Sequence, residues 1–151
     1  MFNSTALIQI IASFVGTLGF GILFNIRGKK LLFSSLGGAF SWFCFLAFNA
    51  LLKKEILCYL LVSIIASIYS EIMARVIKTP VTTFSIAVLI PLIPGSALYY
   101  SLKFALESST SDFVAKASYT LSLAAALSVG IILVNTIARH INFKKFSKAK
   151  K

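Results

Sequence analysis

The chain has 151 residues, of which 58% are apolar, and its mean hydropathy is +0.92. A soluble globular domain is about 45–50% apolar, so this composition predicts an integral membrane protein and excludes a soluble catalytic domain. The length is sufficient for about five helical spans of roughly 20 residues with short loops. We therefore expect one all-α transmembrane domain over residues 1–151.

Hydropathy along the chain divides it into candidate spans. The first span has no Lys or Arg before Arg27, so it lacks the basic start of a secretory signal and we expect it to be retained. A basic tail over residues 140–151 follows the last span. Five spans are predicted in this way: residues 5–24, 31–52, 56–76, 80–106 and 113–138.

The placement of lysine and arginine predicts the orientation. With the N-terminus outside, the outer loops hold only Lys53, Lys54, Lys103 and Lys116. Because positive charge is enriched on the cytoplasmic side, we expect an external N-terminus and a cytoplasmic C-terminus in the cytoplasmic membrane. The basic tail is then expected to contact anionic lipid rather than nucleic acid. Eleven basic residues fall on the cytoplasmic side: Arg27, Lys29, Lys30, Arg75, Lys78, Arg139, Lys144, Lys145, Lys148, Lys150 and Lys151.

The fourth span is interrupted in its middle by a Pro-x-x-Pro-Gly motif. Pro91 and Pro94 remove backbone donors, and Gly95 permits a positive φ, so an unbroken helix is not expected. Lipid cannot satisfy the carbonyls that such a break frees, and broken helices in membrane proteins usually line a cavity. The free N–H groups of a half-helix suit a carboxylate. The predicted substrate-binding residues are Pro91, Pro94, Gly95, Ser96, Tyr99 and Tyr100.

Glu71 is the only carboxylate within a predicted span. It lies about 22 Å along the third span, and Arg75 follows four residues later on the same helical face. Glu before Arg at this spacing favours pairing. The pair is interpreted either as a structural salt bridge or as a site of proton coupling or substrate contact, because intramembrane carboxylates often mark transport pathways.

Other polar residues indicate neither catalysis nor a bound metal or cofactor. Cys44 and Cys58 lie in apolar spans without metal-ligand spacing and are expected to be buried thiols. His140, the only histidine, is expected at the membrane interface. The chain contains no phosphate-binding loop, which excludes ATP-driven transport by this chain, and no set of residues typical of an enzyme.

Small residues recur every four positions along two spans. Ser13, Thr17 and Gly21 do so in the first span, and Gly37-Gly38 adds a point of close contact in the second. Such stripes let helices approach closely in lipid. They either pack within the chain or meet another subunit. The stripe of the fifth span comprises Ser118, Ser122, Ala126 and Gly130.

Three segments together resemble the threonine/serine exporter family, in particular its short component that corresponds to the C-terminal half. They are residues 19–25 (GFGILFN), residues 69–75 (YSEIMAR) followed by Lys78-Thr79-Pro80, and residues 90–100 (IPLIPGSALYY). The similarity extends in order from Thr5 to the last span.

This resemblance implies an export carrier energised by the proton gradient, in which ten spans are divided between two proteins or fused into one. The expected partner is a larger subunit, and a homo-oligomer is the alternative. The implied substrates are threonine and serine, or a dicarboxylate such as succinate. A membrane scaffold without transport activity and a lipid-modifying membrane enzyme are the other hypotheses, and we favour the transporter over both.

Overall fold

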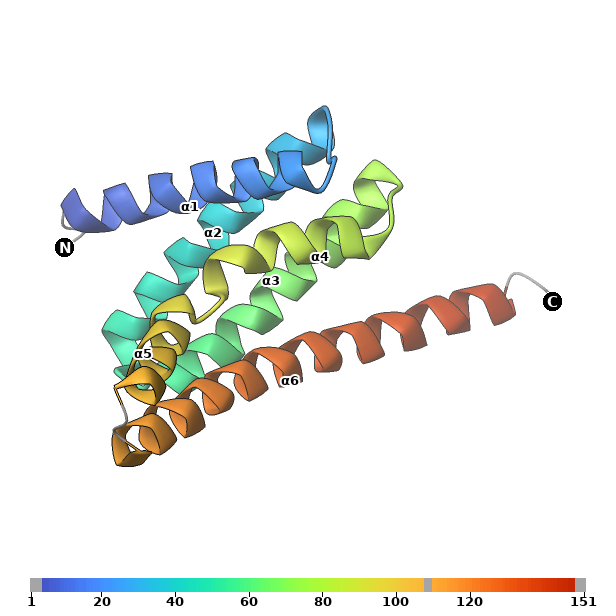
Figure 1. Ribbon diagram of the computed structural model, residues 1–151. Helices are drawn as coiled ribbons and strands as arrows, with labels where there is room; N and C mark the ends of the chain where they lie inside the picture. Colours follow the sequence, from blue (N-terminus) through green and yellow to red (C-terminus); the bar gives the residue numbers. More distant parts are fainter. Residues whose placement is uncertain (1–3, 108–109, 149–151) are drawn as a thin grey trace.

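The computed structural model describes the backbone of residues 4–107 and 110–148, with side chains as far as residue 140 (Figure 1). Every secondary-structure element in these ranges is a helix. In chain order they are α1 (Ser4–Leu23), α2 (Lys29–Leu52), α3 (Glu55–Ile77), α4 (Val81–Leu89), the 3₁₀ helix η1 (Ile90–Leu92), α5 (Gly95–Leu106) and α6 (Thr110–Lys148).

The prediction of an all-α membrane protein is confirmed. Helices α1, α2, α3 and α6 are each long and apolar enough to cross a membrane. The α4–η1 segment and α5 pass the same test only together, and they are bent by 60° at the break between them. The chain therefore has four candidate spans, or five if the bent pair counts as one.

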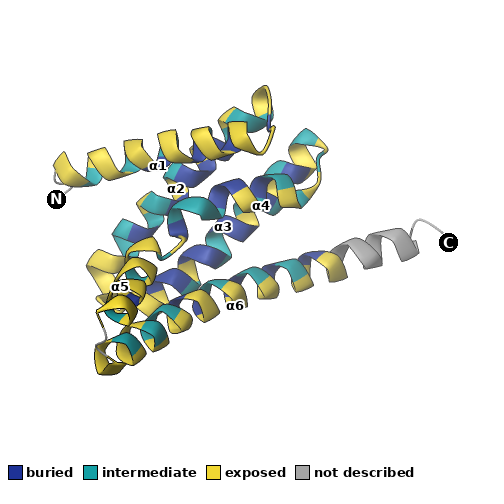
Figure 2. Cartoon of the chain, viewed as in Figure 1, coloured by how far each residue is buried: buried dark blue, intermediate teal, exposed yellow. Residues whose placement is uncertain are grey.

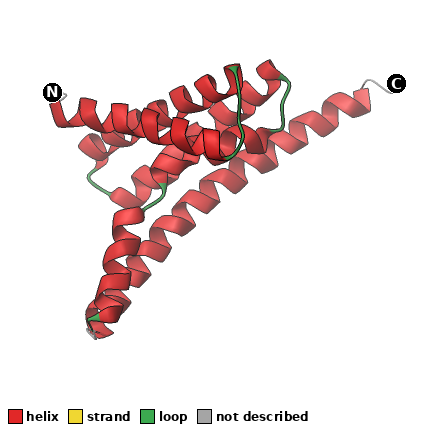
Figure 3. Cartoon of the chain, turned by 45° about the horizontal axis from the view of Figure 1, so that its top comes forward, coloured by secondary structure: helices red, strands yellow, loops and turns green. Residues whose placement is uncertain are grey.

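The helices form a broad, flat bundle rather than a closed one. Helix α1 packs on α2, α2 packs on α3 and α4, and α3 packs on α6. In Figure 1, α1 and α6 lie on opposite sides, with α2, α3 and α4 between them. Helix α5 turns away from α4 and packs along the N-terminal part of α6 (Figure 3). Because the two outer helices each have few neighbours, much of their surface is exposed (Figure 2).

Short turns with a left-handed residue follow the first three helices. Lys53 and Lys78 adopt positive φ after α2 and α3, and the N–H of Thr79 donates to the carbonyl oxygen of Ala74 at 2.9 Å. Pro80 follows at once and cannot continue α3. Gly95 does not use the positive φ that glycine permits. Gly28 is the one glycine with positive φ in the described residues, and Gly95 instead begins α5.

The core combines apolar side chains with serine hydroxyls. Phe45, Val62 and Leu92 belong to one buried cluster, to which α2, α3, α4, η1 and α6 contribute. Most buried hydroxyl groups donate a hydrogen bond to a carbonyl oxygen of their own helix. The Ser70 hydroxyl, for example, donates to the carbonyl oxygen of Ala66 at 2.8 Å. Small side chains that bond within their own helix let neighbouring helices approach closely. The fully buried hydroxyl-bearing residues include Thr17, Ser34, Ser35, Ser41, Ser63 and Ser70.

Most of the small-residue positions pack within the chain. Ser13, Thr17 and Gly21 are buried on α1, and a Cβ at Gly38 of α2 would overlap the Thr17 side chain. On α6, Gly130 packs on α3 in the same way. Ala126 is buried too, whereas Ser118 and Ser122 are exposed. The α1 stripe is therefore an internal contact, and only the start of the α6 stripe is free within this chain.

Two smaller predictions have mixed outcomes. Cys58 is fully buried, as expected, but Cys44 is only partly buried. The basic tail does not begin as a separate segment, because the α6 helix continues through it as far as Lys148. Residues 149–151 lie outside the described part of the chain. His140 is exposed on α6.

Candidate functional site

The break divides the predicted fourth span, residues 80–106, near its middle. Helix α4 has nine residues, which rise about 13 Å, close to half of a hydrocarbon core about 30 Å thick. Pro91 lies in the first turn of η1, Ile93 is extended, and Pro94 caps α5. The two prolines prevent the regular α-helical bonding pattern from passing through this point.

Tight local hydrogen bonds replace part of that pattern. The N–H of Ile93 donates to the carbonyl oxygen of Ile90 at 3.2 Å, and the N–H of Gly95 donates to that of Ile93 at 2.7 Å. The first α-helical bond of α5 runs from the N–H of Leu98 to the carbonyl oxygen of Pro94, at 3.1 Å. The N–H groups of Ser96 and Ala97 precede this bond, in the first turn of α5. Such groups have no acceptor in their own helix, so this end carries a partial positive charge.

A cavity of about 240 Å³ adjoins the break. One wall of the cavity is formed by α1, with Gln9, Ala12 and Ser13. The rest of the lining comes from Trp42 of α2 and Pro91 of η1. The indole Nε1–H of Trp42 donates to the side-chain oxygen of Gln9 at 3.4 Å. We call this the break cavity. Its lining is mostly apolar. Gln9 is exposed, Trp42 is partly buried, and the Ser13 hydroxyl donates to the carbonyl oxygen of Ile10 within α1 at 2.8 Å.

The predicted substrate residues do not all reach this cavity. Pro91 lines the cavity. Pro94, three residues later, is partly buried and is not among the lining residues. Gly95 and Ser96 are exposed, and no atom lies within 4 Å of the position a Cβ would take at Gly95. Tyr99 and Tyr100 are exposed on α5, with their rings edge to face at 5.4 Å. Within this chain, the six residues therefore form a cavity edge and an exposed helix face.

Gln9 and Trp42 are the site residues that sequence analysis missed. Gln9 is the one glutamine of the chain and lies in an apolar span, which could have drawn attention to it. Its partner Trp42 is 33 residues away. Only the packing of α1 on α2 shows that the two side chains meet.

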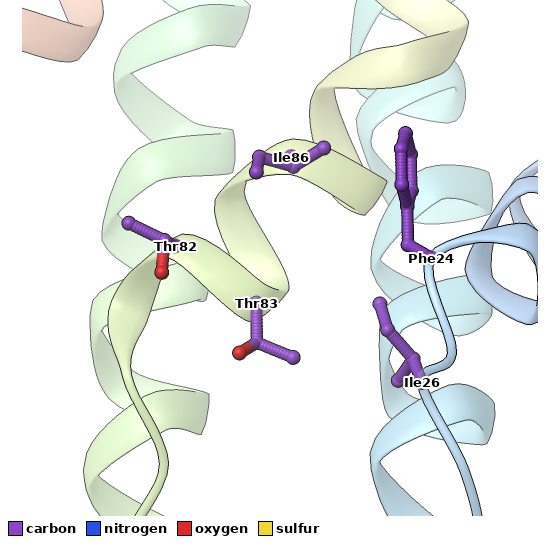
Figure 4. Close-up of a pocket in the computed structure, with 5 residues that line it drawn as sticks. All are labelled: Phe24, Ile26, Thr82, Thr83 and Ile86. Atoms are coloured by element: carbon purple, nitrogen blue, oxygen red, sulfur yellow. The ribbon is translucent and has the colours of Figure 1, made fainter.

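A second cavity lies at the other end of α4 (Figure 4). It has a volume of about 260 Å³ and lies between the segment that joins α1 to α2 and the first turns of α4. Helix α4 thus has one cavity at each end. The lining residues are Phe24, Ile26, Thr82, Thr83 and Ile86.

The Glu71–Arg75 pair forms as its spacing predicts. The Nη2 atom of Arg75 lies 3.2 Å from Oε2 of Glu71, and its Nε atom lies 3.4 Å from the same oxygen. The Glu71 side chain is 15% exposed and that of Arg75 is 49% exposed. Both line a groove between α3 and α6, which we call the α3/α6 groove. Neither lines the break cavity, so the pair and the break belong to different hollows of the bundle.

Apolar helices with a break inside one candidate span and a hollow beside that break are features found in secondary carriers. Comparison with protein families gives the same class. The sequence profile of the threonine/serine exporter family, ThrE, matches residues 9–137. The chain belongs to this family of exporters. Neither the curated proteins nor the solved structures compared with the chain gave a match.

Proposed function

We propose that this protein is one half of a secondary exporter that moves threonine and serine out of the cell with the energy of the proton gradient. The observation that supports the proposal is the break in the fourth candidate span, with the break cavity beside it, in a member of an exporter family. A carrier needs a substrate site within the membrane that can be opened to either side.

The groups around the break match the chemistry of a small hydroxy amino acid. The first-turn N–H groups of α5 suit its carboxylate. The amide oxygen of Gln9 accepts hydrogen bonds from an ammonium or hydroxyl group, and the hydroxyl of Ser13 lies in the same wall. No Lys or Arg is among the described residues that line the break cavity. A second carboxylate would lack a cation there, which favours amino acids over a dicarboxylate.

The second cavity, with Thr82 and Thr83, fits a cytoplasmic entrance. In the proposed topology, α4 begins on the cytoplasmic side and ends at the break. Substrate would pass from the hydroxyl-lined cavity along α4 to the break cavity. Glu71 is the proposed proton carrier, because its carboxylate lies within the predicted third span and only 15% of its side chain is exposed.

The proposal of a half-carrier rests on the exposed face of α5. Ser96, Tyr99 and Tyr100 extend the predicted site, yet nothing in this chain covers them. Carriers commonly bind substrate between two repeats. A larger partner with five further spans would complete the site, with this chain supplying the broken helix.

Vesicle reconstitution tests the proposal. Vesicles with this chain and the larger subunit should export threonine and serine when a pH gradient is imposed, and vesicles with this chain alone should not. Gln9→Leu should reduce the apparent affinity about two- to tenfold, because a net hydrogen bond contributes about 0.5–1.5 kcal/mol. Ser128→Ala is the control, since that hydroxyl is exposed, lies outside the small-residue stripe and donates to the carbonyl oxygen of Ala124 within α6.

Each alternative has its own outcome. Export by this chain alone at the rate of the pair would replace the half-carrier with a self-sufficient homo-oligomer. Export of succinate but not of amino acids would identify a dicarboxylate carrier. No export by the pair, with both proteins inserted, would favour a scaffold. Unchanged affinity in the Gln9→Leu variant would place the substrate site elsewhere.

A further inference from the structure

The α3/α6 groove has apolar walls and opens on the surface of the bundle. Ile64, Ile68 and Ile72 form the α3 wall, and Leu133, Ile137 and Ala138 form the α6 wall. From Ile64 to Arg75, the groove spans twelve residues of α3, and the eleven steps between them rise about 16 Å. That length matches one leaflet of a hydrocarbon core about 30 Å thick.

The groove is narrow. Its volume is about 420 Å³ over a length of about 16 Å. The acyl chain of a lipid can lie along such a groove, and the charge at the end of the groove favours a lipid as its occupant.

Positive charge lies at one end of the groove. Arg75 is at this end with 49% of its side chain exposed, and two of its contacts are directed to Glu71. Two further basic residues, Lys78 directly after α3 and Arg139 directly after Ala138 of the α6 wall, are exposed beyond the groove lining. Since Glu71 offsets one of these three charges, the end keeps an excess of positive charge. The proposed topology places it at the cytoplasmic surface, where anionic lipids attract basic residues.

We propose that the α3/α6 groove is a binding site for an anionic phospholipid. One acyl chain lies between the isoleucines of α3 and the apolar face of α6, and the phosphate contacts Arg75 at the end of the groove. Arginine is well suited to this contact, because its planar guanidinium group presents five N–H donors. Glu71 limits the affinity by drawing part of that group to itself.

Native mass spectrometry of the detergent-solubilised protein tests the site. The protein is offered phosphatidylglycerol and phosphatidylcholine with identical acyl chains. We expect preferential retention of phosphatidylglycerol. Arg75→Gln should reduce this preference about fivefold, the effect of removing one basic charge near anionic lipid. Glu71→Gln should increase it by a similar factor, because it releases Arg75. Lys103→Gln, on α5 and paired with Glu107, should leave it unchanged.

The apolar part of the site has a separate test. Ile68→Trp should fill the groove and reduce retention of both lipids. Ile68 is 45% exposed, so the larger side chain can be accommodated without unfolding, and Leu133→Trp on the opposite wall is a second variant. Ile8→Trp, on the exposed face of α1, is the control. Equal retention of the two lipids by the unmodified protein would overturn the proposal. The proposal would also be overturned if the Ile68→Trp and Leu133→Trp variants retained as much lipid as the Ile8→Trp control. A decreased preference for phosphatidylglycerol in the Glu71→Gln variant would have the same consequence. These readouts do not depend on export.

Discussion

At Gly130, α6 approaches α3 so closely that no side chain fits between them. A Cβ there would overlap the Ser63 hydroxyl and lie 3.0 Å from the carbonyl oxygen of Leu60, which belongs to the backbone and cannot turn aside. We expect Gly130→Ala to destabilise the protein by about 1–3 kcal/mol, the usual cost of overpacking. Thermal unfolding of the detergent-solubilised protein measures this.

Gly19→Ala is the matched control for this prediction. No atom lies within 4 Å of the position that a Cβ would take at Gly19, and alanine is favoured over glycine in a helix by up to about 1 kcal/mol. This control should melt at or above the temperature of the unmodified protein. A Gly130→Ala variant that melts with the control would mean that α6 does not pack on α3 at this point.

Glu71 and Arg75 are a residue pair whose role a double variant can separate. If Glu71 carries the proton, Glu71→Gln abolishes pH-driven export, and the Glu71→Gln/Arg75→Gln variant does not restore it. If the pair is only structural, the double variant should be better tolerated than either single one, because an unpaired charge away from water is costly. Export driven by an imposed pH gradient, at equal protein level, is the measurement. Recovery in the double variant would exclude proton coupling through Glu71.

Among the helices, the bent pair of α4–η1 and α5 depends on two prolines. We expect the Pro91→Ala/Pro94→Ala variant to restore helical N–H donors and to reduce the 60° bend. Each arm is about 18 Å long, so complete straightening would lengthen the distance from residue 82 to residue 106 by about 5 Å. Spin labels at these two positions measure the change. We expect the same variant to show a lower rate of export.

Pro80→Ala provides the control, since Pro80 precedes α4 and lies outside the break. It should leave the distance between the labels unchanged. An unchanged distance in the double proline variant would show that the packing of α5 on α6, rather than the prolines, maintains the bend.

For the whole molecule, the predicted topology is five crossings with the N-terminus outside. Cysteine labelling in a background without Cys44 and Cys58 should place residue 3 and the Lys53-Lys54 turn outside and residue 151 inside. The physical reason is the excess of basic residues on the cytoplasmic side. Labelling of both termini from the cytoplasm would instead mean an even number of crossings, with residues 80–106 re-entering from one side.

The length of α6 shows that this helix extends beyond the membrane. Its 39 residues rise about 58 Å, whereas the hydrocarbon core is about 30 Å thick. Even strongly tilted, the helix must extend beyond the membrane. Its C-terminal turns carry the basic residues of the predicted tail, so the positive charge of this end is presented on a helix as far as Lys148.

Much of this protein could be predicted from the sequence because the relevant physics is local. Apolar runs about 20 residues long have to be helical in lipid, where every backbone group needs a partner. A break at Pro91 and Pro94 could be expected in the fourth span, since neither has an N–H to donate. Glu71 and Arg75 had to be neighbours, because residues four apart share a helix face. The family could likewise be recognised from short motifs in order along the chain.

Only the tertiary structure decided which residues meet across helices. Gln9 and Trp42 come together because α1 packs on α2, and no local rule relates two residues so far apart in sequence. The same packing places the Ser13–Thr17–Gly21 stripe inside the chain. The direction taken by α5 after the break leaves Tyr99 and Tyr100 exposed rather than beside Pro91. A helical period shows which residues share a face, but the face that becomes a cavity depends on how closely small residues allow neighbouring helices to approach.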